Sequence, residues 1–251
     1  MLRKTRDWVF TVPLLLLFGV TLLVHDVVGR LALLFGQRPF ERVMASLQRS
    51  IVSIYRVAGT SVSVERSPLL EPNTGYLIVS NHQSLFDIAI IGGLLFTNYP
   101  KYVAKKELAN WIPSVSLNLK RGGNALIDRD DRRQSLRAIK RMAENAQSRG
   151  VSVVIFPEGT RSRDGELGEF RRAGSITLMK AADQLAIVPA AVDGAWRLLV
   201  DNMMPVPFGT QVRVYFGDPI DRTPDEDLDA TLDRVRQEIA ATLHRWRSTA
   251  G

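Results

Sequence analysis

The sequence predicts an α/β fold: a mixed, mostly parallel sheet with helices on both faces, preceded by a membrane-associated helical N-terminal region. Three observations support this prediction. From residue 61 onward, short apolar runs typical of strands alternate with longer runs typical of helices. Residues 8–24 contain no charged side chain. Between these parts, residues 38–58 have the pattern of an amphipathic helix. The 251 residues are enough for one sizeable domain with a small appendage.

The N-terminal run, WVFTVPLLLLFGVTLLV (residues 8–24), lies at the lower length limit for crossing a bilayer. A second apolar patch at residues 31–35 is separated from it by Arg30 and is too short to cross alone. Basic residues flank the run on both sides: Arg3, Lys4, Arg6, Arg38, Arg42, Arg49 and Arg56. This pattern fits a hairpin or a helix in one leaflet better than a single span. We therefore expect monotopic attachment to the cytoplasmic face of the inner (cytoplasmic) membrane.

A secretory signal peptide is the alternative interpretation of the apolar run. No convincing small-x-small cleavage site follows residue 24, and the run is long for a signal peptide. We therefore favour a retained anchor. A boundary near residue 60 would then divide the chain into a membrane-anchoring helical region, residues 1–59, and a larger catalytic domain, residues 60–251.

Strand-like and helical segments alternate through the larger domain. The strand-like segments are residues 61–65, 75–80, 101–105, 124–128, 151–156, 186–193 and 211–216. The helical segments are residues 84–97, 131–148, 172–184 and 224–247. We expect the last helix to begin with Thr223 as its cap and Pro224 at its first position. Such alternation indicates strands joined by helices that cover the sheet.

The composition excludes several kinds of site. The chain has no cysteine, which excludes disulfides, thiolate nucleophiles and cysteine-based metal sites. His25, His82 and His244 are scattered and form no HExxH motif, so we expect no metal centre. The formal net charge of +7 favours anionic partners. Nucleic acid is a distant alternative among these partners, because no recognition motif accompanies the charge.

The stretch VSNHQSLFD, residues 79–87, places His82 five positions before Asp87. On a continuous helix these two side chains would point apart, since helix neighbours occur at i+3 and i+4. A strand followed by a loop and a helix start lets them meet. We expect Ser84 to cap this helix and Asp87 to lie in its first turn. The alternative is a structural loop histidine beside a capping aspartate.

A second motif, VSVVIFPEGTRS (residues 151–162), ends a β-branched run at Pro157. The turn that follows carries Glu158, Gly159, Thr160 and Arg161. Arg161 can hold a phosphate or carboxylate with two hydrogen bonds, and Gly159 permits close backbone approach. The alternative is a solvated turn whose Glu–Arg pair binds nothing.

Two further segments also contain a predicted strand. RGGNALIDRDDRR, residues 121–133, delivers Asp128 and Arg129 at the end of a strand, although it could also be a solvated helix start. AIVPAAVDGA, residues 186–195, reads as a buried strand with Pro189 at an edge or a bulge. For most residues of the second segment, core packing is the better interpretation.

Four motifs in order resemble blocks of the glycerolipid acyltransferase family that contains 1-acyl-glycerol-3-phosphate acyltransferase. They are NHQSLFD, GNALIDR, FPEGTRS and IVPAAVDG, and the resemblance covers roughly residues 60–220. It implies an enzyme that transfers a fatty acyl chain from acyl-CoA or acyl-ACP to the free hydroxyl of lysophosphatidic acid. The product would be phosphatidic acid, an intermediate of phospholipid biosynthesis.

The same resemblance implies roles for the motif residues. His82 would be the general base and Asp87 the residue that orients it. A free imidazole has a pKa of about 6.5, which suits proton transfer near neutral pH. No cofactor and no covalent acyl-enzyme are expected, in keeping with the lack of cysteine and of a G-x-S-x-G elbow.

The acceptor phosphate would be held by a group of polar residues: Glu158, Gly159, Thr160, Arg161, Arg129, Lys120 and Arg121. Asn81 and Asp128 would support the neighbouring loops. The expected partners are membrane phospholipid, the lysophospholipid acceptor and the acyl-CoA or acyl carrier protein donor, and not nucleic acid. Three alternatives stay open: an acyltransferase for another lyso-lipid such as lyso-ornithine lipid, a membrane-bound thioesterase, and a catalytically inactive membrane scaffold.

Overall fold

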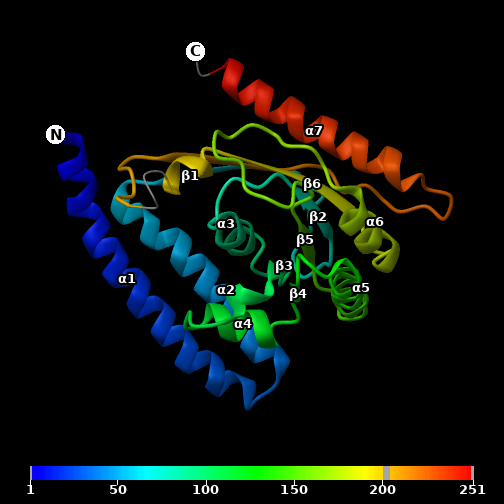
Figure 1. Cartoon of the computed structure of the whole chain (residues 1–251), viewed down its shortest axis with the longest axis horizontal. Helices are drawn as coiled ribbons and strands as arrows, with labels where there is room; N and C mark the ends of the chain where they lie inside the picture. Colours follow the sequence, from blue (N-terminus) through cyan, green and yellow to red (C-terminus); the bar gives the residue numbers. More distant parts are fainter. Residues whose placement is uncertain (1, 200–203, 250–251) are drawn as a thin grey trace.

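Seven strands form one mixed sheet in the order β1-β7-β6-β2-β5-β3-β4 in the computed structural model, which describes residues 2–199 and 204–249 (Figure 1). The strands are β1 (Ser61–Arg66), β2 (Leu77–Ser80), β3 (Lys101–Lys105), β4 (Ala125–Ile127), β5 (Val153–Ile155), β6 (Ile187–Asp193) and β7 (Gln211–Phe216). The ends of each strand lie within a few residues of the ends of a predicted segment. The predicted mixed, mostly parallel sheet is confirmed.

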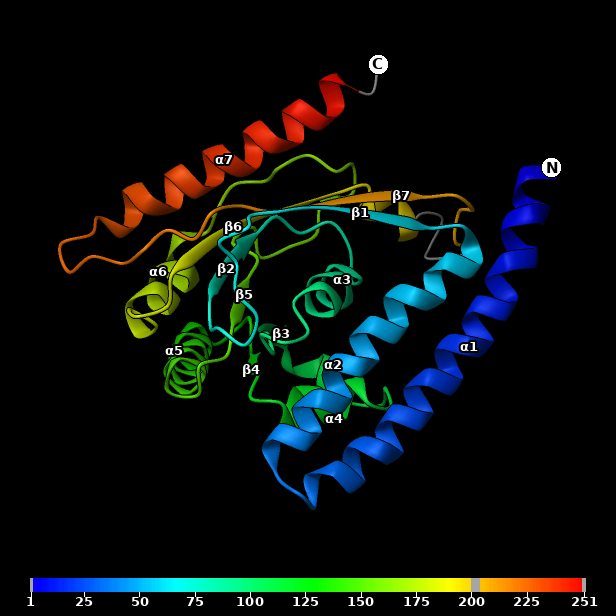
Figure 2. The same cartoon turned by 180° about the vertical axis from the view of Figure 1, so that it is seen from behind.

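The helices are α1 (Leu2–Leu33), α2 (Gln37–Ile54), α3 (Asp87–Leu94), α4 (Val115–Arg121), α5 (Arg132–Ser148), α6 (Arg172–Ala181) and α7 (Leu228–Ser248). Three short 3-10 helices join them: η1 (Tyr55–Ala58), η2 (Lys106–Ala109) and η3 (Ala195–Leu199). Helices α5, α6 and α7 cover one face of the sheet, and α2 and α3 cover the other (Figures 1 and 2). The predicted helical layers on both faces are therefore present.

The direction of the strands brings several loops to one edge of the sheet. Strands β6, β2, β5, β3 and β4 run parallel, whereas β7 runs antiparallel to β6 and parallel to β1. The central strand β2 is buried along its whole length, which explains its uninterrupted apolar sequence. The loops that follow β2, β5, β6 and β4 therefore lie at the same carboxyl-terminal edge. In open α/β sheets this edge carries the ligand site.

Helix α5 illustrates how the sequence pattern produces the layers. Its buried side chains are Ile139, Met142, Ala143 and Ala146, at positions i, i+3, i+4 and i+7. This spacing places them on one stripe of the helix. Asp131 accepts a hydrogen bond from the Gln134 backbone N–H at 2.8 Å and caps the helix start. The boundaries predicted for this helix are correct because both the stripe and the cap are local signals.

The N-terminal helices form an antiparallel pair on the outside of the molecule, with α1 running alongside α2 (Figures 1 and 2). One stripe of α1 packs against the protein, and the opposite stripe carries exposed apolar residues: Trp8, Val9, Val12, Leu16, Leu17, Val20, Leu23, Val24, Val27, Val28 and Leu31. Among the described residues, one helix, Arg3–Leu33, is long and apolar enough to cross a membrane. The exposed stripe extends along the helix, so a bilayer can contact it from the side.

Hydrogen bonds fix α1 near both of its ends. The Asp7 carboxylate accepts from the Phe208 backbone N–H at 3.1 Å. Near the other end, the Asp26 carboxylate accepts from the Ser114 backbone N–H at 2.7 Å. These two bonds hold α1 against the body of the molecule. Helix α1 continues without interruption through Arg30 to Leu33, so the first residues of the apolar patch at 31–35 belong to the same helix as the longer run.

One hydrophobic cluster joins the N-terminal helices to the sheet. It contains Phe40 and Met44 of α2 together with Ile78 and Val188 of the central strands. Helix α2 therefore contributes to the core of the larger domain while also supporting α1. The division into residues 1–59 and 60–251 stays a prediction.

Two predicted helix starts are wrong. Helix α3 begins at Asp87, with Phe86 at the N-cap position, so Ser84 does not cap it. The Ser84 hydroxyl instead accepts from the Phe86 backbone N–H at 3.3 Å, because the loop continues two residues further than expected. Helix α7 begins at Leu228 and is capped by the Asp227 carboxylate, which accepts from two backbone N–H groups of its first turn. This cap lies closer to the helix than Thr223 or Pro224.

Pro189 lies in a central strand, so the predicted edge position is wrong and the predicted bulge is correct. Strand β6 pairs with β2 on one side and β7 on the other. On the β7 side, Ile187 pairs with Ile220 and Ala190 pairs with Phe216. The two intervals, 190 − 187 = 3 and 220 − 216 = 4, show one extra residue opposite Pro189. The bulge removes the need for the N–H group that proline lacks.

A buried ion cluster joins α2 to the sheet. The Glu41 carboxylate lies 2.5 Å from Lys101 Nζ and 2.8 Å from Arg149 Nη2, with Arg38 Nη1 at 3.4 Å. Glu41 and Lys101 are almost completely buried. Burial lowers the pKa of the Lys101 ammonium, and the Glu41 charge partly offsets this effect. The stability of the cluster therefore depends on each charged group keeping its partner.

We expect Glu41→Ala to lower the free energy of unfolding by about 3–5 kcal/mol, because it leaves the buried Lys101 ammonium without its carboxylate. Denaturant unfolding in detergent measures this change. The control is Glu144→Ala on α5, which removes an exposed ion pair with Lys140 and should change stability by less than about 1 kcal/mol. Equal losses for the two variants would contradict the expected importance of the cluster.

Candidate active site

The loop between β2 and α3 brings His82 and Asp87 together, as the strand–loop–helix hypothesis predicts. His82 Nδ1 lies 2.8 Å from Asp87 Oδ2. The Asp87 side chain is fully buried, whereas 16% of the His82 side chain is exposed. The aspartate is thus shielded from solvent while the imidazole stays reachable from the edge of the sheet.

Asp87 also holds the loop itself. Its Oδ2 atom accepts from the Gln83 backbone N–H at 2.6 Å and from the Ser84 backbone N–H at 2.8 Å, in addition to His82. These three donors fix the position of the carboxylate. A carboxylate beside Nδ1 places the imidazole proton on that nitrogen, so Nε2 keeps a free lone pair. The geometry therefore provides a base at Nε2.

The His82 ring is also fixed by stacking. It lies on the Phe156 ring, with 4.1 Å between ring centroids and 14° between the planes. Phe156 directly follows β5, the parallel neighbour of β2. Residues that follow two adjacent strands thus position the imidazole: Asp87 after β2 and Phe156 after β5.

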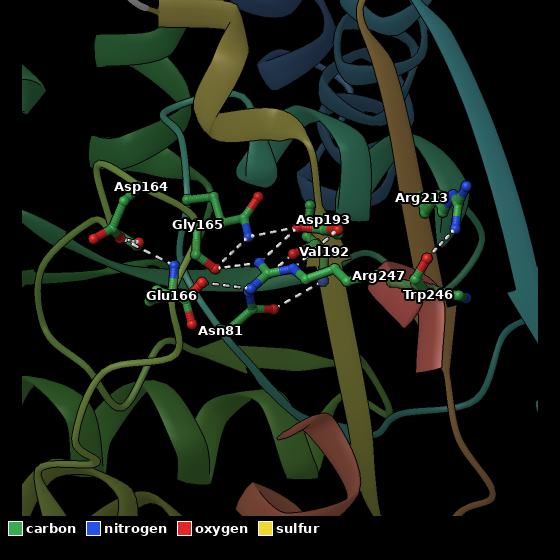
Figure 3. A network of polar contacts seen from close by, with 11 residues as sticks. Asn81, Asp164, Gly165, Glu166, Val192, Asp193, Arg213, Trp246 and Arg247 are labelled. Atoms are coloured by element: carbon green, nitrogen blue, oxygen red, sulfur yellow. Dashed lines mark hydrogen bonds and ion pairs between the residues drawn. The ribbon is translucent and has the colours of Figure 1, made fainter. Parts of the chain in front are cut away.

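Asn81 ties the same loop to the other neighbouring strand (Figure 3). Its side-chain amide donates to the Val192 carbonyl at 2.9 Å, and its side-chain carbonyl accepts from the Val192 N–H at 2.8 Å. The side chain therefore substitutes for a backbone unit of β2 beyond its last paired residue. This geometry is that of a loop support, the position predicted for Asn81.

Glu158 is buried and cross-links two loops. One carboxylate oxygen accepts from the His82 backbone N–H at 2.8 Å, and the other accepts from the Gly168 backbone N–H at 3.0 Å. Burial raises the pKa of Glu158, while these two N–H groups act in the opposite direction. Both oxygens are occupied inside the protein. The carboxylate therefore holds the His82 loop to the loop at Gly168, and its predicted contact with the acceptor phosphate stays a prediction.

The turn after Glu158 is surrounded by guanidinium groups. Gly159 has a φ of 66°, in the left-handed region that favours glycine. Arg129 Nη2 donates to the Gly159 carbonyl at 2.6 Å. The Arg171 side chain passes the other side of the glycine, where an added Cβ would lie 3.3 Å from Arg171 Cδ. Arg161 and the neighbouring Thr160 are exposed on this turn.

Arg161 has no hydrogen-bond or ion-pair partner among residues 2–199 and 204–249, so its guanidinium is available to a ligand. The next residue, Ser162, donates its backbone N–H to the His82 carbonyl at 2.8 Å. This bond joins the arginine-rich turn directly to the histidine loop. Arg171 was not predicted as a site residue. Its only signal in the sequence is that it precedes another arginine at the start of a predicted helix.

Lys120 and Arg121 lie elsewhere. They end α4 and precede β4, whereas Arg129 follows β4 at its other end. Lys120 Nζ donates to the Asn110 side chain at 3.2 Å, and the Arg121 carbonyl accepts from Gln37. In the described part of the chain, no contact joins either residue to the turn at Gly159. The structure therefore does not bring these two predicted site residues to the others.

Asp128 directly precedes Arg129 at the end of β4. Its carboxylate forms an ion pair with Lys106 and accepts from the Asp130 backbone N–H at 3.1 Å. These contacts close the turn from which Arg129 extends. The supporting role predicted for Asp128 stays a prediction.

The C-terminal helix also reaches this edge (Figure 3). Arg247 Nη2 donates to the Gly165 carbonyl at 2.6 Å and to Asp193 Oδ1 at 3.0 Å, and Nη1 lies 2.8 Å from Glu166 Oε1. The Gln83 side-chain amide reaches the same Gly165 carbonyl at 3.2 Å. Gln83, which follows His82, and Arg247 of α7 thus donate to the same carbonyl oxygen. The sequence carries no local signal for Arg247, because all of its partners are distant along the chain.

Comparisons with known proteins agree with this fold and motif set. The sequence model of the family described as Acyltransferase matches residues 61–193. The 1-acyl-sn-glycerol-3-phosphate acyltransferase alpha of Ovis aries is 29% identical over 83% of this chain and 71% of its own length. The chloroplastic 1-acyl-sn-glycerol-3-phosphate acyltransferase BAT2 of Brassica napus is 31% identical over 90% of this chain, which spans 63% of that protein.

A solved structure is similar over almost the whole chain. It is the crystal structure of the 1-acyl-sn-glycerophosphate (LPA) acyltransferase PlsC from Thermotoga maritima, with a TM-score of 0.78. The match covers 98% of both chains at 20% sequence identity. This likeness shows the shared fold, including the helices before the sheet.

The raised pKa of Glu158 predicts a pH-dependent difference between the parent and Glu158→Gln. A folded-state pKa above the ordinary value of 4.5 means that the folded chain binds this proton more tightly than the unfolded chain. The contribution of Glu158 to stability is therefore largest below pH 4.5 and falls as the pH rises through the raised pKa. Glutamine has similar size and does not titrate.

Urea unfolding of both proteins in detergent, from acidic to neutral pH, measures this difference. The stability of the parent relative to Glu158→Gln should decrease as the pH rises. A difference that is constant, or that grows with pH, would show that burial does not dominate the titration of Glu158.

Proposed function

The chain belongs to the acyltransferase family, and from this premise we propose that it transfers a fatty acyl chain from an acyl thioester to the free hydroxyl of lysophosphatidic acid. The product is phosphatidic acid. The observation that carries the proposal is the His82–Asp87 pair, 2.8 Å apart, in a loop bonded to an arginine-rich turn. The names of the sheep and Brassica relatives support this choice of acceptor.

The proposed reaction is a direct transfer. His82 Nε2 takes the proton of the acceptor hydroxyl while the hydroxyl oxygen attacks the thioester carbonyl carbon. The tetrahedral intermediate then breaks its C–S bond, and the imidazolium returns the proton to the departing thiolate. Asp87 stabilises the imidazolium and holds Nδ1, as the aspartate does in a hydrolytic triad. No protein thiol takes part, because the chain has no cysteine.

The acceptor phosphate would be bound by the arginines around Gly159. Arg161 is exposed and has no partner among the described residues, which leaves its planar fork free for two charge-assisted hydrogen bonds. Arg129 and Arg171 flank the same turn. We assign Glu158 a positioning role, since both of its oxygens already accept backbone hydrogen bonds. Thr160 is exposed beside Arg161 and would contact the same phosphate.

The acyl donor would be acyl-CoA or acyl carrier protein. Both present an anionic carrier to the protein, and the net charge of +7 favours such a partner. We expect the donor to approach from the cytosol. The acceptor would reach the same edge from the membrane.

The packing of α1 supports attachment to one leaflet. One stripe of α1 lies against the protein along the helix, so a spanning α1 would draw α2 into the hydrocarbon with it. Arg38, Arg42 and Arg49 of α2 are exposed and would be costly to bury there. We therefore place α1 in the interface plane, on the cytoplasmic face of the inner membrane.

We expect His82→Ala to lower the rate of acyl transfer by at least about 100-fold, because it removes the general base. The assay supplies a labelled acyl thioester and lysophosphatidic acid in detergent and separates the lipid products. His244→Ala on α7, an exposed histidine, is the matched control and should keep the parental rate.

Labelled phosphatidic acid formed by His82→Ala at the parental rate would overturn the mechanism. If the parent released free fatty acid without a new phospholipid, it would be a thioesterase. Equal use of lyso-ornithine lipid would contradict the choice of a phosphorylated acceptor. Lack of turnover with every donor and acceptor would favour the inactive scaffold.

Arg161→Ala should reduce kcat/KM for lysophosphatidic acid by about 10- to 100-fold, the effect of losing a hydrogen bond between two charged groups. The reduction should be much smaller for monoacylglycerol, which has the same hydroxyl and no phosphate. Arg141→Ala on the exposed side of α5 is the control. Equal losses for the two acceptors would remove Arg161 from the phosphate site.

A further inference from the structure

The loop between η2 and α4 exposes an aromatic side chain completely. Trp111 is 99% exposed, and its neighbour Ile112 is 38% exposed. Tryptophan is on average a highly buried residue, because its ring carries a large apolar surface. A fully exposed indole therefore indicates a binding partner.

The backbone holds this tip in a fixed conformation. Trp111 has a φ of 71° and Ser114 a φ of 56°, values that are uncommon for residues other than glycine. Hydrogen bonds hold the loop on either side of Pro113. The Ile112 N–H donates to the Ser116 hydroxyl at 3.0 Å, and the Ser114 N–H donates to the Asp26 carboxylate at 2.7 Å. The indole therefore projects from a constrained loop, as strained functional loops do.

The loop lies beside the membrane-facing helix. The bond to Asp26 joins it to α1, and Leu117 of α4 lies close to Gly29, where an added Cβ would be 3.2 Å from its Cδ2 atom. Figures 1 and 2 show the loop before α4 alongside α1 from opposite sides. The turn after α1 carries Leu34 and Phe35, each 79% exposed. Exposed apolar side chains thus occur both on the loop beside α1 and in the turn that follows α1.

Cations lie at the base of the loop. Lys120 reaches the Asn110 side chain at 3.2 Å, and Arg121 follows it on α4. Both are exposed. An apolar tip with cations behind it matches a membrane interface, where tryptophan lies at headgroup level and lysine or arginine lies near lipid phosphates.

We propose that Trp111 and Ile112 insert into the lipid interface as a second membrane contact beside α1, with Lys120 and Arg121 next to headgroup phosphates. The inference rests on the membrane attachment included in the proposed function. A single helix lying in a leaflet can roll about its long axis. A second contact beside that axis restricts the roll and so sets the direction in which the active-site edge faces.

The lack of cysteine in the chain permits a direct test with single-cysteine variants of the full-length protein. Ile112→Cys probes the loop, Leu23→Cys probes the exposed stripe of α1, and Arg141→Cys on α5 is the negative control. Each variant is labelled with an environment-sensitive nitrobenzoxadiazole group. The labelled proteins are mixed with phosphatidylcholine–phosphatidylglycerol vesicles that contain nitroxide-labelled lipid.

We expect a blue shift and nitroxide quenching at positions 112 and 23, and neither effect at position 141. A response at position 23 without one at position 112 overturns the second contact while leaving attachment through α1 intact. Lack of response at both positions overturns the inference together with the membrane attachment itself. These two failures are therefore distinguishable.

A second measurement uses activity. Trp111→Glu should lower turnover of lysophosphatidic acid in vesicles at least about fivefold relative to turnover in detergent micelles, because a carboxylate cannot enter the interface at low cost. Turnover in micelles should equal that of the parent, which also reports correct folding. Trp111→Phe should restore most of the vesicle activity. An unchanged ratio of vesicle to micelle turnover in Trp111→Glu would contradict the inference.

Discussion

One carboxylate oxygen, Oδ2 of Asp87, organises the candidate active site. It accepts from the imidazole of His82 and from the backbone N–H groups of Gln83 and Ser84. The same atom thereby shapes the loop, sets the imidazole tautomer and supplies negative charge behind the ring. Because Asp87 is the first residue of α3, it also lies at the positive end of the helix dipole, where a carboxylate is favoured. The geometry of the loop and the orientation of the imidazole thus depend on one carboxylate.

The rest of the site consists of cross-links between loops that leave one edge of the sheet. Asn81 joins the histidine loop to β6, Glu158 joins it to the loop at Gly168, and Arg247 joins both regions to α7. Asn81 and Glu158 satisfy backbone groups that the sheet no longer pairs, and Arg247 bonds both to the Gly165 carbonyl and to the Asp193 carboxylate. Such bonds reduce the freedom of the loops before a substrate arrives, which favours correctly oriented reaction. Arg161, on the same edge, has no partner within residues 2–199 and 204–249, and these cross-links are made by other residues.

Helix α1, with its exposed apolar stripe, is packed into the same connected structure. Helix α1 packs through one stripe on α2, and α2 contributes Phe40 and Met44 to the core beneath the sheet. Contact of the exposed stripe of α1 with a membrane would therefore orient the whole domain. The apolar stripe is exposed because a bilayer, and not protein, is its proposed partner. This arrangement suits the proposed reaction, in which the acceptor lies in the membrane and the donor comes from the cytosol.

The sequence by itself determined the strands, the α5 stripe and cap, and the meeting of His82 with Asp87, because these features depend on residues a few positions apart. It did not reveal that Glu158 points inward, that Arg171 and Arg247 approach the site, or that Lys120 and Arg121 lie away from it. Those outcomes depend on strand order and on helix packing between distant segments. Only the tertiary structure decides them, since a hydrogen bond between residues far apart along the chain leaves no periodic or local signal in the sequence.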